Sequence, residues 1–392
     1  MRKPRSAGSG APVALMATRG RRLLHAALAA LVLAGCGDSP GGPVAADPPN
    51  LLPSPSFPEC RPVEPYTPTG EWRYTCPTDA GFDSTRLREA VDAWAAFPKV
   101  HGVLVARHGY VVLEAYHSGY DSRFRFYQQS ATKSVTSALV GIAIGRGELA
   151  GRSAILRDLI PTYLRPSDDP AVATITLDQL LTMSSGFDGP PVGPRPLVRS
   201  LLARPVVHEP GTFFAYDDGG FHVLAVALQT VTGSNLRDHA NQHLFAPLGF
   251  TVGSGEWATD DLGIPYGSTG LRLSLREMAK VGELYLRDGV WDGVPVLPAG
   301  WVASTRAAVA LPNLPQEGLS YGLGWWLVNY AGHDAFFAAG HGGQTITVVP
   351  DADLVVAITA DPRDDGAWQR YRTVIGEHLL PALLPERAGV GR

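Results

Sequence analysis

From about Phe82 onward, the spacing of apolar and polar residues shows two patterns along the chain, one helical and one typical of β-strands. The stretch 84–97, STRLREAVDAWAAF, carries apolar residues at helical spacing and predicts an amphipathic helix that ends before a proline. Two β-rich runs follow, at 102–109 and 110–119, and a His-Gly pair stands between them. This arrangement predicts a β-hairpin directly after the first helix.

The middle of the chain is predicted to be helical. The run from Ser130 to Gly145 is apolar on most sides, which indicates a buried helix. Further helices are expected at 155–165, 176–183, 221–231, 235–246 and 274–288, strands at 321–330, 335–343, 344–350 and 353–360, and a last helix at 365–381. Strands near both ends with helices between them predict an α+β fold, in which one antiparallel sheet is flanked by helices and carries a helical lobe.

The beginning of the chain has a different character. Residues 19–36, RGRRLLHAALAALVLAGC, combine a basic segment, a short apolar run and small residues before a cysteine, which is typical of a secretory signal. The apolar run is too short for a permanent membrane helix. The ending Leu33-Ala34-Gly35-Cys36 resembles a bacterial lipobox, so Cys36 is the predicted site of lipidation. The alternative is an ordinary cleaved signal with an incidental cysteine.

Three regions are therefore expected: a lipoprotein signal peptide at 1–35, a tether at 36–80 and a catalytic domain at 81–385. Residues 37–70 hold ten prolines and little periodic apolar pattern, a composition typical of an extended, semi-rigid tether. Cys60 and Cys76 remain after the signal is removed. In an oxidising compartment such a pair is predicted to form a disulfide.

Charge narrows the range of partners. The whole chain has a formal charge of −4, and loss of residues 1–35, which contain six basic and no acidic residues, makes it −10. An acidic chain without a basic stripe argues against nucleic-acid binding. The expected partners are a small-molecule substrate and, through the lipid anchor, a membrane.

Lysine is rare in this chain, and one lysine stands at a chemically significant place. The sequence has four lysines against 29 arginines, and Lys133 follows Ser130 by three residues at a predicted helix start. Residues i and i+3 share a helix face, so the amine can reach the hydroxyl. Burial and the helix dipole both disfavour the ammonium form. A neutral lysine is one way to activate a serine, whereas arginine does not release its proton.

Two further motifs supply candidate chemistry. Tyr216, in the segment Tyr216-Asp217-Asp218, is predicted at a loop tip, where a phenol can exchange protons with Ser130 and Lys133. The segment 341–344, HGGQ, lies between two β-rich runs, and its glycines allow close approach of a ligand. The Gln344 N–H, together with that of Ser130, is a candidate oxyanion hole. A plain β-bulge is the alternative for HGGQ.

The order Ser-x-x-Lys, Tyr-x-Asp, His-x-Gly resembles the serine β-lactamase and penicillin-binding superfamily. The similar branch is class C-like and includes esterases, D-aminopeptidase-like enzymes and 6-aminohexanoate-dimer hydrolases. The resemblance runs from about Phe82 to Leu384 and includes the stretches ITLDQLLTMSSGF (175–187), HEPGTFFAY (208–216), 268–302, YGLGWW (321–326) and GHGGQ (340–344). It implies a β-lactamase/transpeptidase-like fold and catalysis without a metal or organic cofactor.

The resemblance also implies roles for individual residues. Ser130 is the expected acylated nucleophile, Lys133 and Tyr216 exchange its proton, and Gln344 contributes to the oxyanion hole. Which of Lys133 and Tyr216 is the base stays open, because the two titrate as a pair.

The chain departs from the β-lactamase pattern at two positions. Asp218 stands where true class C enzymes carry an asparagine, and His341, two residues before Gly343, stands where they carry a lysine that faces a substrate carboxylate. Neutral histidine holds an anion more weakly than lysine. The resemblance therefore implies a serine hydrolase that acts on a carboxylic ester or a small amide rather than an efficient β-lactamase.

Two other motifs are expected to carry no chemistry. The one G-x-S-x-G match, at 37–41, lies in the tether, without the strand and helix that such a nucleophile elbow needs. His239 and His243 are four residues apart on a predicted helix, but HANQH lacks the glutamate of a zinc-protease motif. Surface histidines explain it better than a metal site, so no metal is predicted.

Two alternatives to an ester or amide hydrolase remain. A cell-wall D,D-peptidase or β-lactamase-type enzyme agrees with an envelope location but is disfavoured by His341. A non-catalytic penicillin-binding-like recognition module has no need of an activated Ser130. The sequence thus predicts a serine hydrolase anchored by lipid in a bacterial cell envelope, facing the periplasm or the exterior.

Overall fold

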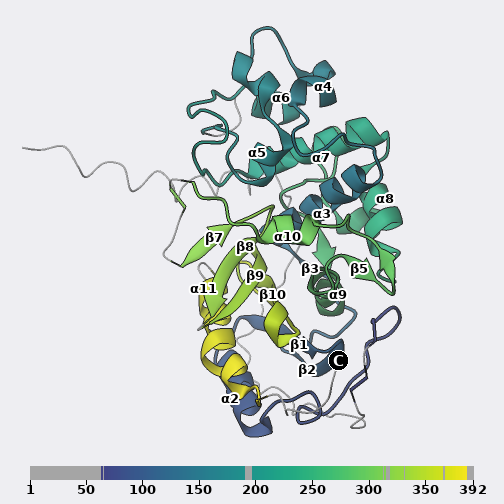
Figure 1. Cartoon of the computed structure of the whole chain (residues 1–392), viewed down its shortest axis with the longest axis vertical. Coiled ribbons are helices and arrows are strands. Elements are labelled where there is room, and N and C mark those ends of the chain that lie inside the picture. The colour runs from purple at the N-terminus through teal and green to yellow at the C-terminus, as the bar shows by residue number, and fades with distance from the viewer. Residues whose placement is uncertain are drawn as a thin grey trace, which may run out of the picture. The chain divides into compact units, whose positions relative to one another are not determined.

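A seven-stranded antiparallel sheet organises the protein in this computed structural model (Figure 1). The structure describes residues 63–385 except 65, 190–196, 312, 315–317, 331 and 365–366. The sheet has the order β2-β1-β11-β10-β9-β8-β7. Its strands are β1 (Val100–Arg107), β2 (Tyr110–Tyr116), β7 (Leu319–Tyr321), β8 (Trp326–Tyr330), β9 (His333–Gly340), β10 (Gln344–Val349) and β11 (Leu354–Ala360). The first hairpin therefore pairs directly with the last strand.

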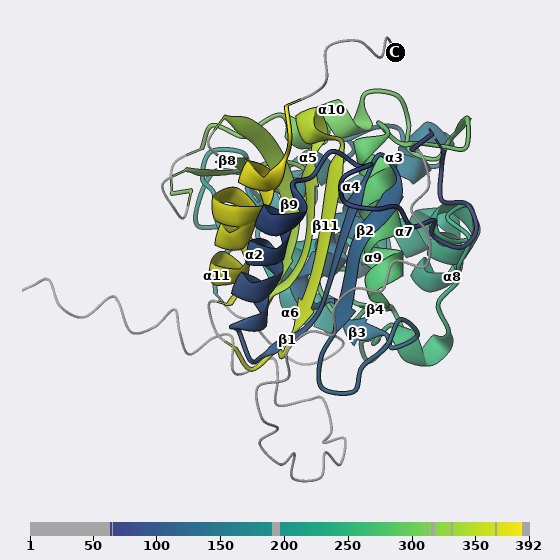
Figure 2. The same ribbon diagram turned by 90° about the horizontal axis from the view of Figure 1, so that it is seen from below.

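Helices cover both faces of this sheet, as Figure 2 shows from below. Helix α9 (Leu275–Leu286) packs on β1, β10 and β11, and α2 (Ser84–Ala95) lies with α11 (Ala367–Val374) on the opposite face. Along β1, Leu104 belongs to the core on the α9 side and Val103 to the core on the α2 side. Because both faces are covered, β10 and β11 are buried along their whole length instead of alternating between buried and exposed residues.

A helical lobe continues from the α9 side of the sheet (Figure 1). Its elements are α3 (Thr132–Gly145), α4 (Leu156–Leu159), α5 (Leu177–Leu181), α6 (Leu197–Leu202), α7 (Asp218–Thr232), α8 (Leu236–Ala240) and α10 (Trp301–Arg306). Helix α3 is the centre of the lobe and is buried along almost its whole length, as its apolar sequence predicts. A sheet with a helical lobe confirms the predicted α+β fold.

Most predicted elements appear, with instructive exceptions. The His108-Gly109 hairpin turn is present, with both residues at positive φ (55° and 82°). The predicted helix 155–165 is reduced to one helical turn, α4, and a 3-10 turn. The predicted strand 321–330 is divided into β7 and β8, which pair with each other, because the chain turns between them: the Gly322 N–H donates to the Trp325 carbonyl oxygen at 2.9 Å and Gly324 has φ +76°.

Short elements were not predicted at all. They are α6, α10 and the two-residue strands β3 (Phe126–Tyr127), β4 (Arg272–Leu273), β5 (Val290–Trp291) and β6 (Val294–Pro295). β3 and β4 pair with each other although they lie far apart in the sequence: Phe126 pairs with Leu273, 147 residues later. Such pairs have too few residues to show a period in the sequence.

The predicted signal peptide, Cys36 and Cys60 lie outside the described residues. Cys76 is disulfide-bonded, and its partner also lies outside them, so the pairing with Cys60 stays a prediction. Among the described residues, no helix is both long and apolar enough to cross a membrane.

Candidate active site

Ser130 lies in a one-turn 3-10 helix, Gln129–Ala131, between β3 and α3. Gln129 has φ +50°, a left-handed conformation that residues other than glycine rarely adopt. The Gln128 side chain donates to the carbonyl oxygens of Phe126 (2.9 Å) and Leu273 (3.3 Å). The serine turn is thereby tied to both short strands, β3 and β4.

The end of strand β9 presses directly on the serine turn. A Cβ added at Gly340 would lie 2.2 Å from the Gln128 carbonyl oxygen and 3.1 Å from the Gln129 Cβ. Only glycine allows two backbones to approach this closely. Gly340 therefore places the sheet against the turn that presents Ser130.

Lys133 is buried at the first turn of α3, with 1% of its surface exposed. Its Nζ donates to Asp218 Oδ1 at 2.5 Å and to the Ser268 carbonyl oxygen at 3.1 Å. Burial lowers the pKa of Lys133, but the negative charge of Asp218, with a smaller contribution from Tyr216, outweighs it and raises that pKa above its usual value. The sequence-based expectation of a readily deprotonated amine is therefore wrong, because Asp218 stabilises the ammonium form.

Hydroxyl groups hold α3 in place around Lys133. Each donates a hydrogen bond of 2.7 Å to a backbone carbonyl: Ser134 to Gly324, Thr136 to Gly267 and Ser137 to Leu323. Buried polar groups need such partners, so these bonds fix the rotation of the helix. They keep the Lys133 amine pointed at Asp218.

Tyr216 lies in the loop before α7, as predicted, and is 43% exposed. Its ring stacks parallel to that of Trp326, with centroids 6.0 Å apart and an interplanar angle of 11°. Lys133 Nζ lies 4.9 Å from the centroid of the Tyr216 ring. The structure thus brings Lys133, Tyr216 and Asp218 into one cluster.

Arg204 and Asp217 position this tyrosine, and no sequence pattern indicated their pairing. The Asp217 carboxylate accepts two bonds from the buried Arg204 guanidinium, at 2.8 and 2.9 Å. It also caps α7 by accepting from the N–H groups of Gly219 and Gly220, both at 2.9 Å. Asp217, the residue after Tyr216, is therefore held both by Arg204 and by the first turn of α7. A buried Arg-Asp pair 13 residues apart leaves no periodic signal.

The HGGQ segment forms the tight turn between β9 and β10, so it is not a simple bulge within one strand. Gly342 and Gly343 have φ +79° and +103°. A Cβ at Gly343 would lie 2.4 Å from the Tyr371 ring. His341, between them and Gly340, is exposed.

Gln344 begins β10, and its side chain points into the protein. Its Nε2 donates to the Ala360 carbonyl oxygen at 2.6 Å, and its Oε1 accepts from Thr359 Oγ1 at 2.7 Å. The side-chain amide is therefore satisfied by β11. In register, Gln344 stands opposite Gly340, the residue that touches the serine turn.

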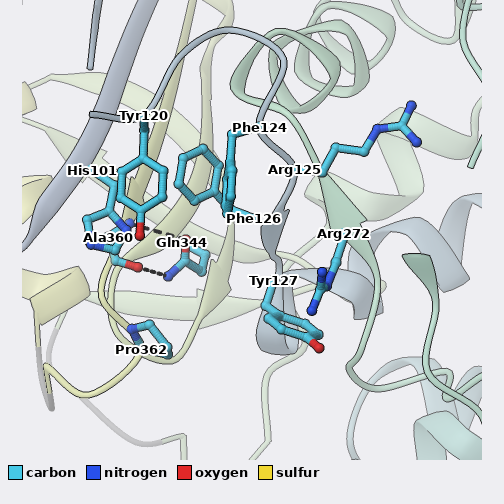
Figure 3. Close-up of a pocket in the computed structure, with 10 residues that line it drawn as sticks. All are labelled: His101, Tyr120, Phe124, Arg125, Phe126, Tyr127, Arg272, Gln344, Ala360 and Pro362. Carbon is cyan, nitrogen blue, oxygen red and sulfur yellow. Dashed lines mark hydrogen bonds between the residues drawn. The ribbon is translucent and has the colours of Figure 1, made fainter. Parts of the chain in front are cut away.

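A pocket of about 170 Å³ lies beside Gln344 and strand β3 (Figure 3). Aromatic rings form most of its wall, and Arg272 covers the ring of Tyr127 with the guanidinium carbon 3.8 Å from the ring centroid. Tyr127 and Arg272 are direct neighbours across the β3–β4 pair. The lining residues are His101, Tyr120, Phe124, Arg125, Phe126, Tyr127, Arg272, Gln344, Ala360 and Pro362.

Carboxylates compensate one of the two arginines that line this pocket. Arg125 pairs with Glu256 and donates to Glu277 through Nε at 2.9 Å. Burial lowers the pKa of His101 to about 4, so this ring is neutral near pH 7. The mostly aromatic wall of the pocket therefore suits an apolar group.

The remaining sequence motifs fall elsewhere. The G-x-S-x-G match at 37–41 lies outside the described residues. His239 is 3% exposed and contacts Glu148, so the expectation of a surface histidine is wrong at that position.

Known proteins resemble this chain along most of its length. The Beta-lactamase family matches residues 95–376. The chain is 26% identical over 283 residues to the 6-aminohexanoate-dimer hydrolase of Paenarthrobacter ureafaciens, which covers 64% of this chain and 70% of that protein. It is 32% identical over 153 residues to the lovastatin esterase of Penicillium rubens, which covers 32% of this chain and 38% of that protein.

The solved structures agree on the fold. EstCE1, a hydrolase with promiscuous acyltransferase activity, superposes with a TM-score of 0.60 at 19% identity, and the match covers 74% of this chain and 98% of that one. Together with the curated relatives, this likeness confirms the fold and the resemblance that the three motifs predicted.

Proposed function

Since the chain belongs to the Beta-lactamase family of proteins, we propose that it hydrolyses a carboxylic ester or a small amide through an acyl-enzyme formed on Ser130. Its membership in a hydrolase family is confirmed, and relatives named as a dimer hydrolase and as an esterase support both substrate classes. The observation that carries the proposal is the cluster of Lys133, Asp218 and Tyr216 beside the serine turn.

In the first half-reaction, Ser130 Oγ attacks the acyl carbon and the proton of its hydroxyl passes to Tyr216, which acts as a phenolate beside the Lys133 ammonium group. The backbone N–H groups of Ser130 and Gln344 donate to the oxyanion of the tetrahedral intermediate. The intermediate collapses, the acyl carbon–leaving group bond breaks, and the leaving alcohol or amine takes the proton from Tyr216. Water then attacks the acyl-enzyme by the same route, which releases the acid and restores Ser130.

Lys133 takes part in this scheme as an ammonium group. Because the Asp218 carboxylate contacts its Nζ, the charged form is favoured in the free enzyme. A buried positive charge next to Tyr216 stabilises negative charge that develops on the tyrosine and serine oxygens during proton transfer. We therefore assign proton acceptance to Tyr216 and electrostatic stabilisation to Lys133.

The substrate side chain enters the aromatic pocket beside Gln344. Its rings offer an apolar wall of limited volume, which suits a small aromatic or branched apolar group. His341 is exposed in the turn between β9 and β10. A histidine at this position is a weaker partner for a substrate carboxylate than a lysine would be.

The test uses the full chain and its Ser130→Ala variant, treated with a fluorophosphonate, a short-chain nitrophenyl ester and a penicillin. Labelling at Ser130 with ester turnover, both lost in Ser130→Ala, supports the proposal. A long-lived penicilloyl adduct without ester turnover would replace it with a cell-wall peptidase or binding module. Absence of labelling in intact-mass spectra by all three reagents contradicts the acyl-enzyme.

We also propose that the protein is attached to a membrane. Cys36, after a basic and apolar segment, supports attachment to a bacterial envelope membrane by a lipid on that cysteine. Cys36→Ala should move the protein from the membrane fraction to the soluble fraction and remove labelling by a radioactive fatty acid. A protein that stays with the membrane and keeps its label contradicts the anchor.

A further inference from the structure

Glu148, His239 and His243 form a second group of reactive side chains, at the far end of α3 from Ser130. Glu148 lies in the turn after α3, His239 in α8, and His243 in the π-helical segment Asn241–Phe245 that continues α8. Helix α3 has 14 residues, a length of about 21 Å, so the group is well separated from the serine turn.

The geometry of these three side chains is close to that of a metal site. His239 Nε2 lies 3.0 Å from Glu148 Oε2, and one ligand atom from each residue lies within 4.8 Å of the others. Tetrahedral zinc with bonds of about 2.0–2.1 Å holds its ligand atoms roughly 3.3 Å apart. One pair therefore already has nearly the required separation, and the His243 ligand atom, within 4.8 Å of the other two, must approach them by at most about 1.5 Å.

The surroundings prepare the three groups for this role. The second carboxylate oxygen of Glu148, Oε1, accepts from Arg146 Nε at 2.7 Å, and Oε2 faces His239 Nε2 across the hydrogen bond that the ion would replace. Such outer hydrogen bonds orient metal ligands.

We propose that Glu148, His239 and His243 bind one Zn²⁺ ion, with water as the fourth ligand. Two imidazoles and a carboxylate are a donor set for zinc, whereas Ca²⁺ and Mg²⁺ prefer oxygen ligands alone. The ion would join the turn after α3 to the α8 segment and stabilise the lobe that carries Lys133. The sequence pointed only to the histidine pair, because the carboxylate comes from a position 91 residues away from His239.

The test is calorimetric titration of the full chain, without a histidine tag, with Zn²⁺, together with Co²⁺ absorption spectra. Wild type should bind one Zn²⁺ and give the visible bands of four-coordinate Co²⁺. His243→Ala and Glu148→Gln should each weaken Zn²⁺ binding at least about tenfold. The control is His333→Ala, which removes another carboxylate-paired histidine (2.9 Å from Asp351) and should leave the affinity unchanged.

A melting experiment separates loss of the site from loss of the fold. Zn²⁺ should raise the Tm of wild type and His333→Ala, because a ligand that binds only the folded state stabilises it, but not that of His243→Ala. Circular dichroism of His243→Ala without metal should match wild type. Absence of saturable Zn²⁺ binding in wild type, or equal binding by wild type, His243→Ala and Glu148→Gln, would overturn the site.

Discussion

Asp218 Oδ1 lies 2.5 Å from Lys133 Nζ, and this ion pair determines the charge of the buried amine. A lysine with 1% exposure and no counterion would lose its proton easily. With Asp218 in contact, the pKa of Lys133 rises above its usual value. The position at which the family resemblance expected an asparagine is therefore the one that sets the protonation state of the site.

Asp218→Asn should separate the two possible roles of Lys133. Without the carboxylate, burial of the amine is opposed only by the smaller contribution of Tyr216, so the pKa of Lys133 falls. If the ammonium form is the active one, the alkaline limb of kcat/KM for a nitrophenyl ester moves to lower pH. A shift of the acid limb to lower pH instead would identify neutral Lys133 as the base and refute the assignment to Tyr216.

The pH dependence of stability must be measured beside these activity profiles as a control. A lysine whose pKa is raised in the folded state contributes stability below its unfolded pKa and loses it as the pH rises through the folded value. Both values lie in the alkaline range for Lys133 in the wild type. Lys133 therefore adds no pH dependence of stability between pH 6 and 8, and thermal melting across this range separates changes in kcat/KM that reflect chemistry from those that reflect unfolding.

Arg204→Met should misplace Tyr216 and destabilise the protein. The change leaves the partly buried Asp217 carboxylate without its main partner, which costs about 3–5 kcal/mol of unfolding free energy. Because Asp217 follows Tyr216, kcat should fall in the fraction that still folds. Arg237→Met removes the exposed pair with Asp238 and is the control, expected to cost less than about 1 kcal/mol. Equal effects in urea unfolding would contradict the positioning role.

Gly340→Ala should disturb the serine turn. The added Cβ would lie 2.2 Å from the Gln128 carbonyl oxygen, so β9 and the turn must move apart. Overpacking of this kind costs about 1–3 kcal/mol, and ester turnover should fall as well. Gly255→Ala is the matched control, since no atom lies within 4 Å of its added Cβ. An active, fully stable Gly340→Ala enzyme would show that the contact is dispensable.

Glu283→Gln should reduce the change in the free energy of unfolding between pH 4.5 and 7. Burial raises the pKa of Glu283 to about 7, even with the Arg287 guanidinium 2.6 Å away. A carboxyl with a raised folded pKa contributes stability below its unfolded value and loses it as the pH rises toward 7. The wild type should therefore lose on the order of 3 kcal/mol between pH 4.5 and 7 from this group. Chemical unfolding at both pH values measures it, and an equally steep Glu283→Gln profile would exclude this origin.

Phe124→Ala should change substrate preference. Phe124 lines the aromatic pocket and is 46% exposed. Its loss should lower kcat/KM for an ester with a bulky apolar group about tenfold more than for an acetyl ester. Leu262→Ala, at a similarly exposed apolar residue outside the pocket lining, is the control. An equal loss on both esters would show that the pocket does not hold the substrate.

The sequence predicted the elements whose signals are local. The His108-Gly109 turn, the buried run after Ser130 and the central strands all appear, because turn chemistry and apolar runs are properties of neighbouring residues. It could not predict the Lys133–Asp218 ion pair or the Arg204–Asp217 pair, since these depend on where distant segments meet. The β3–β4 pair that supports the serine turn was missed for the same reason.

The pairing of β1 with β11 has a consequence for synthesis on the ribosome. Arg107 pairs with Leu354, so the inner edge of the first hairpin lacks its partner until about 250 further residues have been made, which takes roughly 12–50 s at about 5–20 residues per second. During this interval an apolar strand edge is open to wrong partners. Gly340 and Gln344 also emerge late, so nascent chains should require protection by chaperones and acquire the serine turn only when the last strands arrive.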